Sequence, residues 1–322
     1  VSEICFVIKC SIYIKGLTGL IFMQGTPEKQ ALLNNYYQKK AKIPLLVGFD
    51  GEWGLDMRLK NTFRYPWNMT LGAVENNQLI EQFGKRLGIH CKRMGIHINF
   101  APVVDINTNP ENPIIGNRSF GENKFRVTEK AIAFVKGMQG AGVMANAKHF
   151  PGHGDTAADS HKTLPQLNFD LDRLQEIEMY PYPKLFEEGL TSVMAAHLSV
   201  PSLEPNSAIP TSISYKVITE LLQESMGFNG LVFTDALNMK GAANYAQPGD
   251  IDLAAFLAGN DMLLISEDVG AAVKKIKRAL KKKILTMERL NHSVKKILKA
   301  KYWAGLHDYK PVVLENLQRD LN

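Results

Sequence analysis

One stretch of the sequence gathers most of the side chains that can transfer a proton. Residues 148–161 read Lys-His-Phe-Pro-Gly-His-Gly-Asp-Thr-Ala-Ala-Asp-Ser-His, with Gly and Pro at the bends. In Asp159-Ser-His161 the carboxylate lies two residues before the imidazole, so it can reach the ring in an extended or turned loop. Such a contact raises the pKa of a histidine and orients its ring. We therefore expect acid/base work by His161, held by Asp159.

The same stretch also permits two other interpretations, an ordinary polar loop and a metal site. Its potential metal ligands are the histidines and aspartates His149, His153, Asp155, Asp159 and His161. Against a metal, no His-x-x-x-His pair falls on a predicted helix, and Lys148 would place a cation beside the ion. An ordinary loop would not need this density of titratable groups. We therefore expect no metal and no cofactor.

A second carboxylate follows a buried apolar run elsewhere in the chain. The sequence Gly-Leu-Val-Phe-Thr at 230–234 leads directly into Asp235, which a strand end would hold rigidly and partly desolvate. A fixed carboxylate facing a proton donor is the minimum set for retaining glycoside hydrolysis. The carboxylate attacks the anomeric carbon while the donor protonates the leaving oxygen. The alternative role for Asp235 is to cap the following helix.

Short apolar runs, each followed by a longer amphipathic stretch, must position these side chains. The predicted strands cover residues 18–23, 43–49, 96–101, 142–147, 191–196, 230–234 and 261–265. The predicted helices cover residues 27–40, 76–93, 128–140, 171–188, 214–226 and 271–283. Strands that are apolar on both faces and alternate with helices indicate βαβ units. Repeated over roughly 300 residues, such units predict an α/β fold, a single-domain (β/α)₈ TIM-type barrel.

The first βα unit departs from the regular spacing. A count of eight strands needs one at residues 4–8, and only about ten residues then precede Thr18, which is short for a crossover helix. We expect a truncated or irregular first unit in a divergent segment 1–17, the barrel over 18–304 and a C-terminal tail over 305–322. A doubly wound sheet competes with the barrel, but no Gly-x-Gly-x-x-Gly follows the first strand.

Polar side chains follow most of the predicted strands directly, as in the active sites of barrels of this type. These groups are Asp50-Gly-Glu-Trp-Gly, Asp105, Lys148-His149, His197, Asp235 and Ser266. A barrel with a purely structural role has little reason for this pattern. We therefore expect an active site at the carboxyl ends of the strands.

Composition excludes several other classes of protein. Apolar residues make up 45% and charged residues 22% of the 322-residue chain, which excludes a disordered or fibrous protein. Much of the formal net charge of +6 comes from segments 274–283 and 295–301, whose apolar residues recur at helical spacing. We interpret these segments as solvated helix faces and expect no nucleic-acid partner. No apolar run approaches the ~20 residues of a membrane-spanning helix.

Cysteine usage and the start of the chain bear on location. The three cysteines form no zinc spacing and no disulfide framework, which suits a reducing compartment. The chain begins without an initiator methionine. We expect a cytoplasmic location, with the periplasm or secretion left open, and a monomer.

Four segments of the chain resemble glycoside hydrolase family 3, and more narrowly its β-N-acetylglucosaminidase branch. The two longest are Lys-His-Phe-Pro-Gly-His-Gly-Asp-Thr at 148–156 with Asp159-Ser-His161, and Gly-Phe-Asn-Gly-Leu-Val-Phe-Thr-Asp-Ala-Leu-Asn-Met at 227–239. Two shorter ones are Asp-Gly-Glu-Trp-Gly-Leu-Asp-Met-Arg at 50–58 and Asn-Pro-Ile-Ile-Gly-Asn-Arg-Ser-Phe-Gly at 112–121. The resemblance runs from about Thr18 to about Trp303. One departure is Trp53, which stands where many members have glycine.

The resemblance implies an exo-acting, retaining β-N-acetylglucosaminidase that trims muropeptides in peptidoglycan recycling. Asp235 matches the nucleophile that forms the covalent glycosyl-enzyme, and His161 with Asp159 matches the general acid/base. The residues that match binders of sugar hydroxyls are Asp50, Arg58, Arg118, Lys148 and His149. Three alternatives stay open: a phosphorylase with the same residues, a family 3 β-glucosidase, and a non-catalytic carbohydrate-binding protein.

Overall fold

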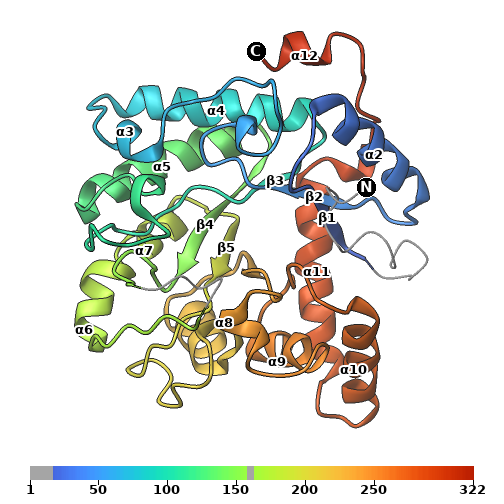
Figure 1. Ribbon diagram of the computed structural model, residues 1–322. Coiled ribbons are helices and arrows are strands. Elements are labelled where there is room, and N and C mark those ends of the chain that lie inside the picture. The colour runs from blue at the N-terminus through green and yellow to red at the C-terminus, as the bar shows by residue number, and fades with distance from the viewer. Residues whose placement is uncertain (1–16, 158–162) are drawn as a thin grey trace.

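The computed structural model describes residues 17–157 and 163–322, which fold around a curled parallel sheet (Figure 1). Its six strands lie in chain order, and each pairs in parallel with the next. They are β1 (Gly19–Ile21), β2 (Leu46–Phe49), β3 (Ile98–Asn99), β4 (Met144–Phe150), β5 (Ser192–Ala195) and β6 (Leu231–Thr234). Nearly all their residues are buried, because helices cover the outer face and the sheet curls around the inner one. This arrangement confirms the predicted α/β class with a parallel sheet.

Helices fill the connections between the strands. The longer ones are α2 (Pro27–Lys40), α4 (Asn77–Arg93), α5 (Lys124–Gly140), α7 (Pro181–Glu187), α9 (Asp250–Ala258), α10 (Val269–Lys281) and α11 (Met287–Trp303). The short ones are α3 (Asn68–Gly72), α6 (Leu171–Arg173), α8 (Lys240–Ala243) and α12 (Leu317–Asp320), and π-helical turns cover Leu174–Glu178 and Lys216–Ser225. Among the described helices, none has the length and apolar character needed to cross a bilayer.

Helices α4 and α5 pack against each other through a pair of glycines. A Cβ atom added to Gly84 of α4 would lie 2.4 Å from the carbonyl oxygen of Phe134, and one on Gly137 of α5 would lie 2.0 Å from that of Glu81. Neither site can hold a side chain without moving the facing backbone. The two helices therefore approach more closely than larger residues would allow, behind the strands β3 and β4.

Two predicted elements differ from the structure. Residues 261–265 form no regular strand and join the sheet by a single parallel bridge from Met262 to Phe233, so the described residues show six strands. The reason is local, since Ile265 has a φ of +47°, outside the extended region, and Asp261 is fixed by a 2.5 Å ion pair with Lys296. The predicted strand at 4–8 lies outside the described residues.

The single helix predicted over 171–188 is interrupted. It divides into α6, the π-helical turn and α7 at Tyr180-Pro181, because proline cannot donate a hydrogen bond to the preceding turn. Helix α5 begins at Lys124, four residues earlier than predicted, because the side chain of Asn123 accepts hydrogen bonds from the backbone of Phe125 and Arg126.

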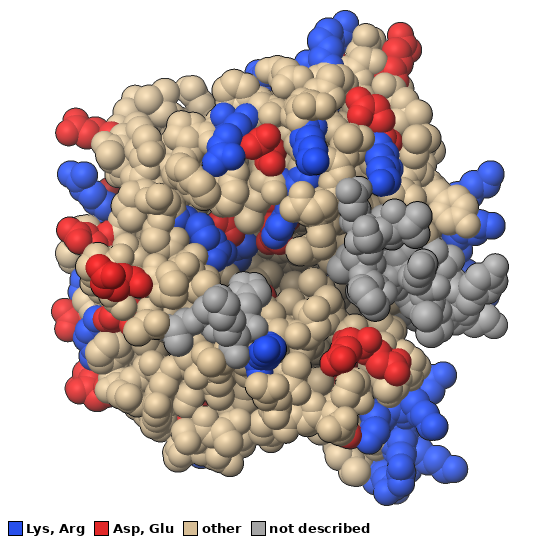
Figure 2. Space-filling model, in the orientation of Figure 1, with Lys and Arg blue, Asp and Glu red and all other residues tan. Residues whose placement is uncertain are grey.

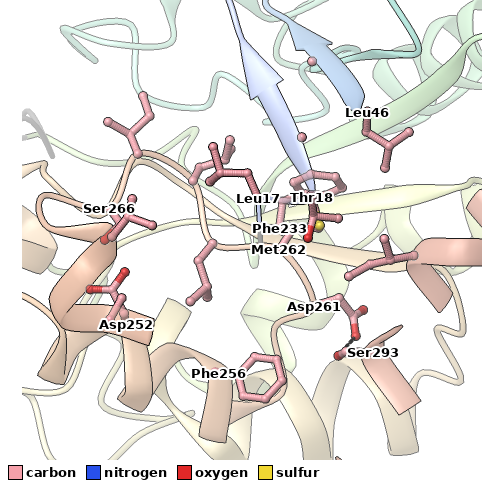
Figure 3. A pocket seen from close by; sticks show the side chains of 18 of the residues that line it. Leu17, Thr18, Leu46, Phe233, Asp252, Phe256, Asp261, Met262, Ser266 and Ser293 are labelled. Atoms are coloured by element: carbon pink, nitrogen blue, oxygen red, sulfur yellow. Dashed lines mark hydrogen bonds between the residues drawn. The ribbon is translucent and has the colours of Figure 1, made fainter. Parts of the chain in front are cut away.

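A mainly apolar cavity of about 360 Å³ lies between β1 and residues 261–266 (Figure 3). Its walls include Leu17 and Phe233, and polar atoms come from Asp252, Asp261 and Ser266. Within the part of the chain that the structure describes, β1 is an end strand of the sheet, and this cavity marks that end.

The segment after α11 folds back onto the outside of the helices. Leu317 and Leu321 are buried in the main core, and α12 lies beside α2 and α4 (Figure 1). Arg93 of α4 donates to the carbonyl of Val313 at 2.6 Å and pairs with Asp320 at 3.0 Å. The predicted tail 305–322 thus packs against the side of the fold.

The stability of the fold should fall in mild acid because of His97. Its Nδ1 accepts a hydrogen bond from the backbone N–H of Val47 at 3.0 Å, and burial, together with the charge of Lys301, lowers its pKa to about 4. An unfolded histidine titrates near 6.5, so between pH 6.5 and 4 the unfolded chain binds more protons. The contribution of neutral His97, about 3 kcal/mol, is therefore complete above pH 6.5 and is lost as the pH falls toward 4.

The variant His97→Asn tests this expectation, because its amide oxygen can accept the same bond and does not titrate. We expect its free energy of unfolding in urea to fall less steeply between pH 6.5 and 4 than that of the parent. Parallel pH profiles for the two proteins would contradict a role for His97.

Candidate active site

A second cavity, of about 320 Å³, lies at the carboxyl ends of the strands. The predicted site residues that line it are Asp50, Arg58, Arg118, Lys148, His149 and Asp235. They follow or end different strands, and parallel strands bring their carboxyl ends to one edge of the sheet. Asp159 and His161 lie outside the described residues. Figure 2 shows a hollow near the middle of one face, with basic and acidic side chains along its edge.

Charged side chains of alternating sign form one wall of this cavity. Lys148 Nζ lies 3.1 Å from Asp50 Oδ1 and 2.8 Å from Glu52 Oε1. Arg118 binds both oxygens of Glu52, at 2.8 and 3.0 Å, and Arg58 binds the second oxygen of Asp50 at 2.7 Å. These are charge-assisted bonds, and the Arg118 pair has the two-pronged geometry that fixes orientation best.

Glu52 is the centre of this network. Its side chain is fully buried, so desolvation opposes its ionisation, but the charges of Arg118 and Lys148 outweigh that effect and lower its pKa. Arg58 and Lys148 act in the same way on Asp50, lowering the pKa of that carboxyl against burial. Both carboxyl groups are therefore ionised at neutral pH, and the wall is organised before any ligand arrives.

Removal of the Lys148 charge should destabilise the fold strongly. The Lys148 side chain is 3% exposed, and without it the fully buried Glu52 and the partly buried Asp50 lose a shared cation. We expect Lys148→Met to lower the free energy of unfolding in urea by roughly 3–5 kcal/mol. A matched control is Lys310→Met, because its partner Asp308 and Lys310 itself are both exposed and their pair is worth under about 1 kcal/mol. Similar losses in both variants would contradict the expectation.

Asp105 holds His149 in place. Its fully buried carboxylate accepts hydrogen bonds from His149 Nδ1 at 2.7 Å and from the backbone N–H groups of His149 and His153 at 3.1 and 2.7 Å. Burial opposes ionisation, but the His149 charge and these bonds lower the pKa of Asp105. A carboxylate can only accept, so the proton of the shared bond sits on Nδ1 of His149. Nε2 is then the nitrogen left for a ligand in the cavity.

Asp235 follows β6 and is held by the backbone. Its own N–H donates to the carbonyl of Ala195 at 2.9 Å, and its Oδ1 accepts the N–H of Ala236 at 2.7 Å. Burial opposes its ionisation, but the charges of His149 and His197 and the bond from Ala236 lower its pKa. The structure does not support the helix-cap alternative, because α8 begins after Met239 and has no side-chain cap.

His197, at the end of β5, positions the chain just after Asp235. Its Nε2 lies 3.0 Å from the carbonyl oxygen of Ala236, and since a carbonyl only accepts, this nitrogen carries the proton. Its Nδ1 lies 2.6 Å from the hydroxyl oxygen of Ser212. The bond from Nε2 ties Ala236, whose N–H supports the Asp235 carboxylate, to a buried histidine.

The remaining candidates of the histidine-rich stretch have other partners. His153 Nδ1 lies 2.6 Å from the hydroxyl of Thr156, and Asp155 pairs with Arg173 at 3.2 Å. Across residues 17–157 and 163–322, no three His, Cys, Asp or Glu side chains are grouped as a metal site.

Sequence reasoning gave no role to several residues of the site. Glu52 and Asp105 stood among the polar groups after predicted strands, and Glu52 also lies in the segment 50–58 that resembles the family. Apolar side chains complete the lining of the cavity, and sequence patterning gave them no role. They include Ile21, Trp53, Met57, Phe100, Ile114 and Met194.

Comparison with known proteins identifies the family and finds similar proteins and solved structures. The family model described as "Glycosyl hydrolase family 3 N terminal domain" matches residues 15–300. Beta-hexosaminidase A of Pseudoalteromonas piscicida is 33% identical over 295 residues, which cover 84% of this chain and 49% of that protein. The chain therefore spans about half the length of this relative.

Two solved structures are also similar. A glycoside hydrolase family 3 β-N-acetylglucosaminidase from Paenibacillus superposes with a TM-score of 0.86 and 33% identity, covering 94% of this chain and 61% of that one. The β-glucoside phosphorylase BglX superposes with a TM-score of 0.91 and 25% identity, covering 99% and 60%. Both likenesses extend over nearly all of this chain.

Proposed function

Because the chain belongs to glycosyl hydrolase family 3, we propose that it is an exo-acting, retaining β-N-acetylglucosaminidase. The observation that carries the proposal is the placement of the Asp235 carboxylate in one cavity with the charged wall of Asp50, Arg58 and Lys148. A volume of about 320 Å³ lies at the small end of ligand pockets, which favours one terminal sugar over an internal segment of a polymer.

The proposed reaction has two steps. In the first, the Asp235 carboxylate attacks the anomeric carbon and forms a covalent glycosyl-enzyme, while His161, supported by Asp159, protonates the departing oxygen. In the second, the same histidine removes a proton from water, which attacks the anomeric carbon and releases the sugar with its configuration retained. The low pKa of Asp235 supports this assignment, because only the ionised carboxylate is a nucleophile.

The charged wall is proposed to bind sugar hydroxyls. Each hydroxyl is both a donor and an acceptor, and the wall offers carboxylate acceptors next to ammonium and guanidinium donors. The two oxygens of Asp50 accept hydrogen bonds from Arg58 and Lys148. Each oxygen keeps a further lone pair that can accept a hydrogen bond from a sugar hydroxyl. Arg118 is proposed to bind sugar hydroxyls and also to hold Glu52 in place. His149 is proposed to bind a sugar hydroxyl through its Nε2.

The choice of N-acetylglucosamine over glucose rests on two supports. One is the Asp159-Ser-His161 sequence, which resembles the N-acetylglucosaminidase branch. The other is that two similar proteins are named a beta-hexosaminidase and a β-N-acetylglucosaminidase. The muropeptide substrate, the cytoplasmic location, the monomeric state, the closed eight-stranded barrel and the domain limits at residues 17 and 304 stay predictions.

A second candidate is a phosphorylase, in which phosphate replaces water in the second step. The likeness to the β-glucoside phosphorylase favours it, as does chemistry, because a neutral or cationic histidine repels incoming phosphate less than a carboxylate would. The catalytic residues would be the same.

One assay separates these candidates. The purified chain is given p-nitrophenyl β-N-acetylglucosaminide, β-glucoside and β-xyloside, each with and without phosphate. We expect release of p-nitrophenol from the first substrate and free N-acetylglucosamine as the product. A sugar 1-phosphate formed only with phosphate present would establish the phosphorylase, preference for the glucoside would establish a glucosidase, and no turnover would leave a binding protein.

A further inference from the structure

Trp53 is, with Phe100, one of two large aromatic side chains of the cavity lining, and it takes no part in the charged network. It follows Glu52 directly and lines the same cavity as Asp50, Arg58 and Asp235. The ring is partly exposed, yet its nitrogen is buried and has no hydrogen-bond partner among the described residues. Because this nitrogen is the only polar atom of the side chain, the side-chain surface that remains accessible is carbon.

Neighbouring residues hold the Trp53 ring in place. The ring centroid of Trp67 lies 4.3 Å away at an interplanar angle of 52°, and the guanidinium of Arg64 lies 5.7 Å from the Trp53 centroid and 5.1 Å from that of Trp67. The Trp53 carbonyl accepts the backbone N–H of Tyr65 at 3.0 Å, and Gly54 turns the chain with a φ of +106°. Contacts with both side chain and backbone therefore fix the ring before a ligand binds.

We propose that Trp53 is a further sugar-binding residue, against which the apolar C–H face of the bound sugar packs. The inference rests on the proposed function, because it takes the ligand of this cavity to be a sugar. A pyranose presents hydroxyls around its edge and C–H groups on its faces, and the lining of the cavity combines charged groups with the fixed carbon surface of Trp53. Ligand sites commonly combine apolar walls with a few placed polar groups in this way.

The alternative is that Trp53 only fills space against Trp67. The two roles predict different results for the same Trp53 variants. A space-filling ring affects the stability of the fold and leaves the affinity of the folded protein for sugar unchanged. A sugar-binding ring contacts substrate and transition state alike, so its loss raises KM and leaves kcat nearly unchanged.

The intrinsic fluorescence of the protein gives a direct test, because the chain has only three tryptophans, Trp53, Trp67 and Trp303. We expect N-acetylglucosamine to change the emission of the parent protein, and Trp53→Phe to lose most of that change while keeping its affinity within about threefold. Trp53→Ala should bind N-acetylglucosamine roughly 10–100-fold more weakly, as expected for loss of a buried aromatic contact. Trp303→Phe, on α11, is the matched control and should keep both signal and affinity.

The outcomes distinguish this inference from the proposed function. If the parent hydrolyses β-N-acetylglucosaminides and both Trp53 variants keep the full signal and affinity, the inference is overturned and the function stands. If the parent binds N-acetylglucosamine with a Trp53-dependent signal but turns over no glycoside, the function is overturned and the inference stands. If the parent binds no sugar, both are overturned. Trp53→Phe decides the matter even where Trp53→Ala fails to fold.

Discussion

An Asp235→Asn variant is expected to lose turnover of β-N-acetylglucosaminides by about 10⁴–10⁶-fold, the range seen when a nucleophile is removed from a catalytic unit. Asparagine is nearly isosteric, and its amide oxygen can still accept the N–H of Ala236, which lies 2.7 Å from Oδ1 in the parent. The fold should therefore be kept. The amide is a poor nucleophile, so the covalent intermediate should not form.

Two measurements check this expectation. Initial rates with p-nitrophenyl β-N-acetylglucosaminide give the loss of turnover, and intact-protein mass spectrometry with a slow substrate should show a glycosyl adduct on the parent only. Asp252→Asn is the control, because Asp252 is also a buried carboxyl but does not line this cavity. Rates equal to those of the parent in Asp235→Asn would rule out Asp235 as the nucleophile.

His161→Ala should slow substrates with poor leaving groups by about 10²–10⁴-fold, the usual value of general acid catalysis. A poor leaving group needs a proton in the transition state, whereas an activated phenolate departs without one. Activated aryl glycosides should therefore suffer much less in the first step. Asp159→Asn should reproduce part of the loss, since the imidazole keeps its place but loses the charge that favours its protonated form.

The measurement is the dependence of kcat/KM on the pKa of the leaving group, over a series of aryl glycosides and one β-linked disaccharide. We expect a steeper dependence for His161→Ala than for the parent, with no effect of added zinc or chelator on either. Equal losses of kcat/KM across the series would show that His161 does not transfer the proton. Strong inhibition by a chelator would support a metal site instead.

The order of the strands was predictable because buried strands appear in the sequence as apolar runs. Each of the six observed strands overlaps a predicted apolar run, since a strand covered on both faces must be apolar throughout. The run 261–265 misled because an apolar run carries no information on hydrogen bonding. The left-handed conformation of Ile265 has no signal in the sequence, whereas the break at Pro181 had one.

Six of the predicted site residues line the cavity, but the pairings among them were not predictable from the sequence. Charged residues directly after strands identified Asp50, Lys148 and Asp235, because the ends of parallel strands share one edge. No spacing indicates that Lys148 contacts Asp50, 98 residues away, or that Glu52 is the carboxylate that joins Lys148 to an arginine. Such pairings depend on side-chain direction at the sheet edge, which only the folded structure fixes.

The close approach of α4 and α5 has a consequence for how the molecule opens. Segments with tight, extensive packing exchange their amide hydrogens only on global unfolding, whereas loosely packed ends exchange through local opening. Helices joined at Gly84 and Gly137 belong to the first kind, and they back the strands that lead to Asp105 and Lys148. The β1 end, bordered by an apolar cavity, belongs to the second. Transient fraying should therefore begin at that end of the sheet and leave Asp105 and Lys148 assembled.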